Sequence, residues 1–97
     1  MERESLNRVA LLFKVLGSEL RLNILLLLGK GPASVGKIVK HCGQEQSLVS
    51  HNLSMLRRLN MVHDLKKGRS RFYRVDPKMW KIVQEVIKPA LLFGKNL

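Results

Sequence analysis

The segment from Gln46 to Leu59, with the sequence QSLVSHNLSMLRRL, constrains the fold of this chain more than any other. At about 100° per residue its side chains sort onto an apolar and a polar helix face. The polar face carries short donors and acceptors beside arginines, and no acid occurs from Gln46 through His63. A merely solvated face would carry Glu–Lys pairs at i,i+4 spacing. We therefore predict a helix that contacts nucleic acid.

Each face of this predicted helix has a distinct composition. Short hydroxyl and imidazole side chains let a helix lie deep in the major groove and still reach base edges. We therefore expect base contacts from Gln46, Ser47, Ser50, His51 and Ser54. The apolar arc comprises Leu48, Val49, Leu53, Met55, Leu56 and Leu59, and the opposite arc comprises Ser47, Ser50, His51, Ser54 and Arg58, with Gln46 and Arg57 at its edge.

Basic residues are concentrated directly after this helix. The chain has 18 Lys and Arg against 7 Asp and Glu, a net charge of +11, which favours a polyanionic partner. Residues 63–66 and 71–75 are expected to form a hairpin around a turn at 67–70, where Gly68 allows positive φ. An anionic membrane would favour a basic amphipathic helix instead. The predicted phosphate contacts are Arg57, Lys66, Lys67, Arg69 and Arg71.

Four further helices are expected. Apolar spacing and glycines predict helices over about 5–16, 18–28 and 34–41, with Ser18 and Ser34 as N-caps. Asp76 supplies a cap, and Pro77 the first position, of a last helix that we expect to break or kink at Pro89. The resulting order predicts a mostly α fold with a small β-hairpin. It is a winged helix-turn-helix in a single domain, 1–97, whose third and fourth helices form the helix-turn-helix.

The terminal helices are more apolar than a lone domain of this size needs. We expect several of their side chains to be poorly covered in a monomer and buried in a two-fold dimer. Two copies would also place two DNA-contacting helices about one DNA turn apart, which suits an inverted-repeat operator. The predicted homodimer interface comprises Leu6, Val9, Phe13, Trp80, Val83 and Ile87.

Several function classes are excluded by what the chain lacks. One cysteine, Cys42, allows no internal disulfide and fits a reducing cytosol. The charged start MERESLNR does not resemble a signal peptide, and the apolar run 24–28 is too short to span a bilayer. We therefore expect a soluble cytoplasmic protein without a membrane partner. No phosphate loop, carboxylate pair or activated nucleophile is present, so neither an enzyme nor a cofactor is expected.

The chain resembles the ArsR family of bacterial and archaeal transcriptional repressors over roughly residues 11–75. That resemblance implies a winged helix-turn-helix homodimer whose first and last helices pair, and an effector that weakens operator affinity. It also implies that the residues predicted above to contact bases lie in the major groove, and that the wing meets phosphate or the minor groove. The motifs that carry it are Leu12–Gly17 (LFKVLG), Arg21 before Ile24–Leu28, Ser34-Val35-Gly36, Gln46–His51, Leu53, Leu56, Met61-Val62, Gly68-Arg69 and Phe72-Tyr73.

The metal chemistry of that family does not carry over. Its thiolate sensors place a Cys-Val-Cys pattern where this chain has Ser34, Val35 and Gly36. Its other common site needs histidines on the last helix, which has none; Asp76 matches the first carboxylate, but Lys78 stands where a histidine is expected. Family members that sense persulfides use two cysteines. No metal is therefore expected, and the effector is left open between none, a thiol oxidant at Cys42 and an organic molecule at the dimer interface.

Other residues have plain structural interpretations. Cys42 is expected to be a small buried hydrophobe, and His41 to be solvated or to face phosphate. Strand alternation puts one of Phe72 and Tyr73 in the core. Glu45 stands where the family usually has a Ser or Thr cap, and its carboxylate lies close to where DNA phosphate is expected.

Two other functions are compatible with the sequence. A sequence-blind architectural or RNA-associated protein could use the same basic surface, and an interaction module could use the exposed helix to bind a protein. We favour a transcriptional regulator of double-stranded DNA, most simply a repressor.

Overall fold

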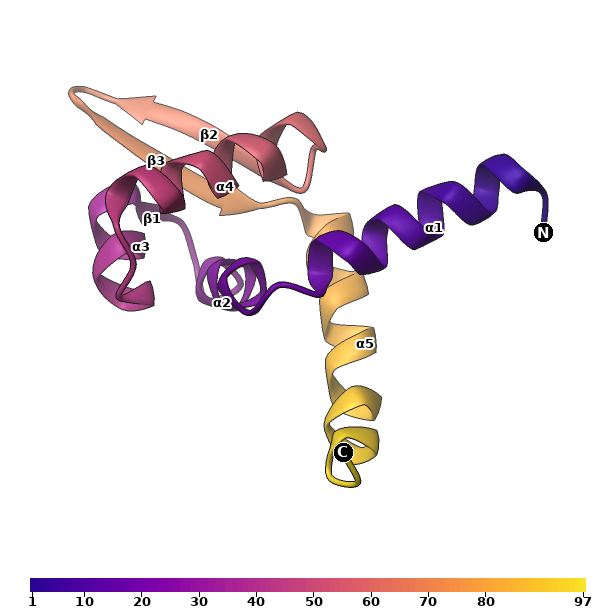
Figure 1. The fold of residues 1–97 in the computed structure, drawn as a ribbon. Coiled ribbons are helices and arrows are strands. Elements are labelled where there is room, and N and C mark those ends of the chain that lie inside the picture. Colours follow the sequence, from indigo (N-terminus) through magenta and orange to yellow (C-terminus); the bar gives the residue numbers. More distant parts are fainter.

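The computed structural model describes residues 1–97 as five helices and a three-stranded sheet. Helices α2, α3 and α4 pack with the sheet into one body, and α1 and α5 extend from it in different directions (Figure 1). The predicted mostly helical winged helix-turn-helix is confirmed. No helix is both long and apolar enough to cross a membrane. In chain order the elements are α1 (Arg3–Leu16), α2 (Glu19–Leu28), β1 (Ala33–Ser34), α3 (Val35–Cys42), α4 (Gln46–Arg58), β2 (Val62–Lys67), β3 (Ser70–Val75) and α5 (Pro77–Gly94).

Three of the five helices, α2, α3 and α5, begin at capping side chains that the sequence indicated. Ser18 Oγ accepts a hydrogen bond from Arg21 N (3.3 Å), and Ser34 Oγ accepts one from Lys37 N (3.2 Å). Asp76 Oδ2 accepts from the backbone N–H groups of the first turn of α5, as predicted. Each cap satisfies amide groups that have no partner within the helix.

One apolar core joins the elements of the body. Ile24 and Leu25 of α2 are fully buried against Ile38 of α3 and against Leu53 and Leu56 of α4. The run 24–28 is therefore core, as expected, except that Leu26 is partly exposed. This packing holds one side of α4 against α2, α3 and the sheet and leaves its opposite side free.

The sheet is larger than predicted. Its order is β1-β3-β2, all antiparallel, with Ala33 opposite Tyr73 and Lys67 opposite Ser70. Strand β1 has only two residues, too few to show alternation in a sequence. The pairing of Lys67 with Ser70 shortens the expected four-residue turn to two residues, with Gly68 at φ 61°. Tyr73 is buried and Phe72 half-buried, so Tyr73 is the inward member of that pair.

Two features of α5 differ from what the sequence indicated. Of the expected break or kink at Pro89, the break does not occur, because the helix continues to Gly94. Proline leaves the carbonyl of Glu85 without its helical donor, but both residues are exposed, so water can reach that carbonyl. Val83, predicted to be poorly covered, is only 1% exposed because it packs in the core of the body.

Candidate nucleic-acid interface

Helices α3 and α4 are joined by a tight turn at Gly43. Gly43 adopts a left-handed conformation, φ 65°, and its N–H donates to Val39 O (3.0 Å), which ends α3. Glu45 is the N-cap residue of α4, but its side chain makes no capping hydrogen bond. Its carboxylate therefore acts on the helix only through its charge, which favours the positive N-terminus of α4.

The polar side of α4 is not covered by the other helices or by the sheet. Gln46, Ser47, His51 and Ser54 are exposed and Ser50 is half-buried, so these five side chains lie along one accessible side, which we call the reading face. The buried side is narrower than predicted, because Leu48 is 43% exposed and Leu59 is also exposed. The buried side also contains Asn52, a polar residue that the sequence analysis did not single out.

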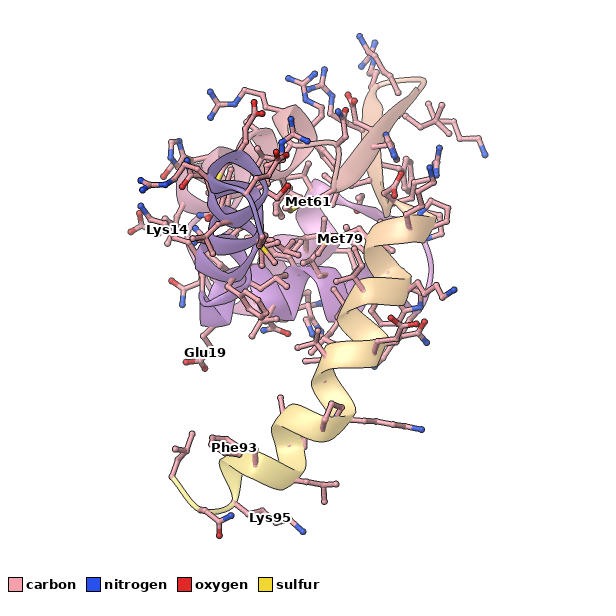
Figure 2. All side chains as sticks on the ribbon, turned by 90° about the vertical axis from the view of Figure 1, so that its right-hand side faces the viewer. Lys14, Glu19, Met61, Met79, Phe93 and Lys95 are labelled. Atoms are coloured by element: carbon pink, nitrogen blue, oxygen red, sulfur yellow. The ribbon has the colours of Figure 1, made fainter.

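The hairpin of β2 and β3 extends beside α4 and forms the wing (Figure 1). All four wing cations predicted to contact phosphate, Lys66, Lys67, Arg69 and Arg71, are exposed. Arg71 Nε lies 3.6 Å from Asp64 Oδ2, which partly offsets its charge. Nitrogen-tipped side chains crowd the hairpin end of the molecule and are fewer at the opposite end, where Phe93 and Lys95 of α5 lie (Figure 2). The wing thus continues the reading face with positive charge.

A histidine–carboxylate pair joins the base of the wing to α5. His63 Nε2 lies 2.7 Å from Asp76 Oδ1, while Oδ2 of the same carboxylate caps α5. The hydrogen bond from His63 is the main cause that lowers the pKa of Asp76, and backbone hydrogen bonds from Met79 and Lys78 lower it further. The two residues are 13 positions apart on different elements, so the sequence pattern did not indicate their contact.

His41 and Cys42, at the end of α3, form no chemical site. His41 is exposed and its Nε2 lies 3.2 Å from Asn23 Oδ1 on α2. Cys42 is half-buried, less than predicted, and desolvation raises the pKa of its thiol. A raised pKa keeps the thiol protonated at neutral pH, which lowers its reactivity. No group of three or more His, Cys, Asp or Glu side chains is placed to hold a metal ion.

The predicted dimer residues differ in how far this chain covers them. Leu6 and Phe13 on α1 are more than half exposed, and Val9 is 39% exposed. Trp80 and Ile87 are half-buried. The Trp80 indole lies directly on Gly29, at the end of α2, where a Cβ would overlap its ring atoms.

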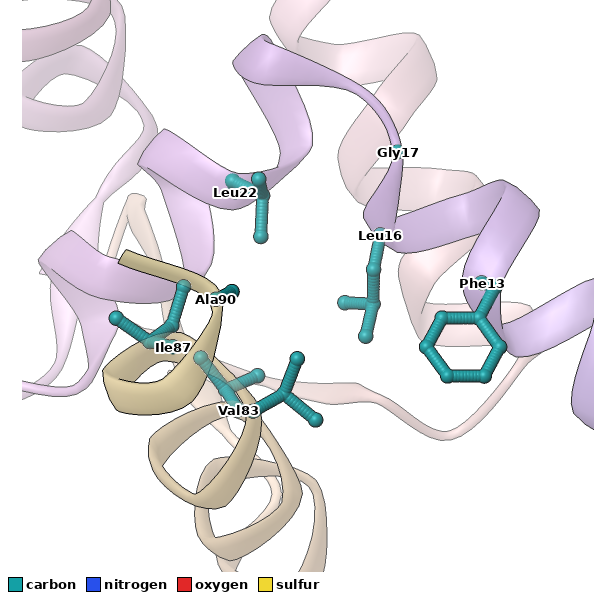
Figure 3. Close-up of a pocket in the computed structure, with 8 residues that line it drawn as sticks. Phe13, Leu16, Gly17, Leu22, Val83, Ile87 and Ala90 are labelled. Carbon is teal, nitrogen blue, oxygen red and sulfur yellow. The ribbon is translucent and has the colours of Figure 1, made fainter. Parts of the chain in front are cut away.

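An apolar cavity of about 180 Å³ opens where α1 meets α5. Phe13 and Leu16 of α1 line one wall, and Val83, Ile87 and Ala90 of α5 line another (Figure 3). Leu91, Leu92 and Phe93 continue this apolar surface toward the end of α5, each at least 65% exposed. Most of the exposed large apolar side chains therefore lie on α1 and α5, and Leu65, 61% exposed, is the one that lies on the wing.

Comparisons with known proteins agree with this geometry. Residues 18–64 match the sequence profile of the family described as "Bacterial regulatory protein, arsR family". The HTH-type transcriptional regulator NmtR of Mycobacterium tuberculosis is 34% identical over 88 residues, covering 90% of this chain and 73% of NmtR. The arsenical resistance operon repressor of Escherichia coli is 37% identical over 79 residues, covering 76% of this chain and 68% of the repressor.

A solved structure extends the likeness to the whole fold. It is the homodimeric winged helix-turn-helix DNA-binding domain of Mb0332 from Mycobacterium bovis, described as a possible ArsR-family transcriptional regulator. It superposes with a TM-score of 0.79 at 27% identity, covering 95% of this chain and 90% of that domain. The chain belongs to the ArsR family of DNA-binding transcriptional regulators.

Proposed function

We propose that this protein acts in the cytoplasm as a homodimeric repressor that binds an inverted-repeat operator through α4 and the wing. The observation that carries the proposal is the separation of two surfaces on one chain. The polar reading face and the basic wing lie together, and most of the exposed large apolar side chains lie on α1 and α5. A two-fold dimer through α1 and α5 leaves both reading faces free to enter successive major grooves.

Each group of residues has a separate role in this proposal. The five side chains of the reading face contact base edges, with Ser50 and His51 at the centre of α4. Arg57 and the wing cations contact phosphate and carry little sequence information. Leu6, Val9 and Phe13 on α1, with Ile87 on α5, contact the partner subunit.

The dimer and the repressor role have different support. The solved relative from M. bovis is a homodimer, and exposed apolar side chains such as Phe13 are otherwise left in water. The relative from E. coli is named a repressor. An operator that overlaps a promoter would exclude RNA polymerase, so added protein should lower transcription from a template carrying the operator. Increased transcription would contradict the repressor role and leave DNA binding intact.

Selection from random duplexes tests the proposed specificity. We expect the protein to enrich an inverted repeat and to bind it at least about 10³-fold more tightly than a scrambled duplex at physiological salt. Equal affinity for both duplexes would favour a sequence-blind architectural protein. Loss of all DNA binding at that salt concentration would favour a protein-interaction module.

Substitutions on the two DNA surfaces should have different effects. Ser50→Ala and His51→Ala should each cost about 1–3 kcal/mol on the selected site and little on scrambled DNA. Arg69→Ala should weaken binding to both duplexes alike and reduce the slope of log K against log salt by about 1. Lys95→Ala, at the far end of α5, is the control and should change neither. Equal effects of Ser50→Ala on both duplexes would contradict the assigned reading face.

A further inference from the structure

One arginine side chain joins the end of α1 to the start of α2. The backbone of Arg21 is fixed by its hydrogen bond to the Ser18 cap. Its Nε donates to Val15 O (2.7 Å), and its Nη2 donates to Lys14 O (3.4 Å). Both carbonyls lie in the last turn of α1, where they have no donor within the helix. The positive charge also complements the negative C-terminal end of α1.

The remaining nitrogen of the same guanidinium reaches the middle of α4. Arg21 Nη1 donates to Asn52 Oδ1 (3.1 Å), and Asn52 Nδ2 donates to Leu48 O, one turn earlier in α4 (2.9 Å). Asn52 is 6% exposed and is the only buried polar residue of the chain. No other hydrogen bond connects α1 or α2 with α4.

Apolar packing holds α4 against the other helices and the sheet, but it defines the rotation of α4 less strictly than a hydrogen bond does. Val49, Leu53 and Leu56 are fully buried. Their hydrophobic contribution to the stability of the fold is roughly proportional to the apolar area buried and does not depend on the direction of contact. A hydrogen bond requires a narrow range of distance and angle. The link from Arg21 to Asn52 therefore restricts rotation and sliding of α4 in a way that the apolar contacts do not.

We propose that Arg21 and Asn52 are positioning residues that fix the orientation of α4 relative to α1. The inference rests on the proposed function, in which α1 belongs to the dimer interface and α4 contacts bases. Because α4 is one continuous helix, holding it at Asn52 also holds the adjacent His51 and Ser50. In the dimer this link sets the distance and rotation between the two reading faces, and hence the half-site spacing that the protein accepts.

The test uses the duplex selected by the wild-type protein and two derivatives, with one central base pair added or removed. Each change moves the half-sites apart or together by about 3.4 Å and rotates them by about 35°. We expect each to weaken wild-type binding at least about tenfold, measured by fluorescence anisotropy. Asn52→Leu replaces the amide with an apolar group of similar volume, and it should reduce the spacing penalty to less than about threefold. Its thermal midpoint and dimer dissociation constant should stay near those of the wild type.

Two further variants keep the test decisive. Arg21→Lys retains the charge but replaces the three separate guanidinium nitrogens with one ammonium nitrogen, which cannot reproduce the fork geometry that reaches both α1 and α4. It should therefore lose spacing discrimination as well, even if Asn52→Leu does not fold. Asn23→Ala is the matched control. It removes another hydrogen bond between helices, the one that Asn23 Oδ1 on α2 accepts from His41 Nε2 on α3, and should keep the wild-type spacing penalty.

The outcomes separate this inference from the proposed function. Wild-type spacing penalties in both Asn52→Leu and Arg21→Lys would overturn the inference alone, and so would an equal loss in Asn23→Ala. A wild-type protein that binds all three spacings equally well would overturn the inference and the symmetric dimeric operator complex together.

Discussion

Replacing glycine by alanine should destabilise the fold at Gly29, which lies against Trp80, and stabilise it at Gly36, which has open space beside it. A Cβ at Gly29 would overlap the Trp80 indole, whereas a Cβ at Gly36 on α3 would meet no atom within 4 Å. Gly29 has helical φ and ψ values of −63° and −22°, so backbone strain does not oppose alanine there. The difference between the two sites therefore isolates the packing of one aromatic ring.

The expected magnitudes follow from this geometry. Overpacking costs about 1–3 kcal/mol, and replacing a helical glycine by alanine returns up to about 1 kcal/mol. Taking the middle of the overpacking range, about 2 kcal/mol, and subtracting up to about 1 kcal/mol, Gly29→Ala should lower the free energy of unfolding by about 1–2 kcal/mol. Each kcal/mol corresponds to about 4–8 °C in Tm. Gly36→Ala should raise the free energy of unfolding by about 0.5–1 kcal/mol.

Thermal unfolding followed by circular dichroism measures both values, at one fixed protein concentration because a dimer's Tm depends on concentration. Trp80 is the only tryptophan, so its fluorescence reports whether the ring has moved. In a Trp80→Leu background the cost of Gly29→Ala should largely disappear, which a double-mutant cycle would show as coupling. A Gly29→Ala protein as stable as Gly36→Ala would refute the reasoning.

Two further predictions concern α5 and the dimer. Asp76 has a lowered pKa in the folded state, so its contribution to stability is present above its unfolded pKa of about 3.9 and is lost as the pH falls through the lower folded value. Asp76→Asn should flatten the acid side of a plot of Tm against pH, and an unchanged acid side would contradict this. Phe13→Glu places a charge in the proposed interface and should weaken dimerisation at least about tenfold in sedimentation equilibrium, whereas Lys40→Glu on α3 should not.

The sequence predicted the parts of the fold that depend on local patterns. Ser18, Ser34 and Asp76 are recognisable caps because their side chains bond amides two or three residues away. Helical periodicity likewise defined α4 and separated His51 from the buried Leu53. These features involve neighbours along the chain, so one sequence is enough to detect them.

Features that depend on contacts distant in the sequence were missed. Strand β1 exists only because β3 pairs with it, and the ionised carboxylate of Asp76 gains its partner His63 only through the hairpin. Asn52 interrupts the expected apolar arc because Arg21, 31 residues earlier, supplies its partner. Val83 was assigned to the dimer because its coverage by the body could not be seen from periodicity on α5 alone.

A crystal structure of the protein bound to its selected duplex would test the central claim most directly. We predict two copies joined through α1 and α5, with α4 of each in successive major grooves, Ser50 and His51 at base edges and the wing cations at the backbone or minor groove. A complex in which α4 faces away from the bases, or in which one copy binds without a partner, would contradict the account.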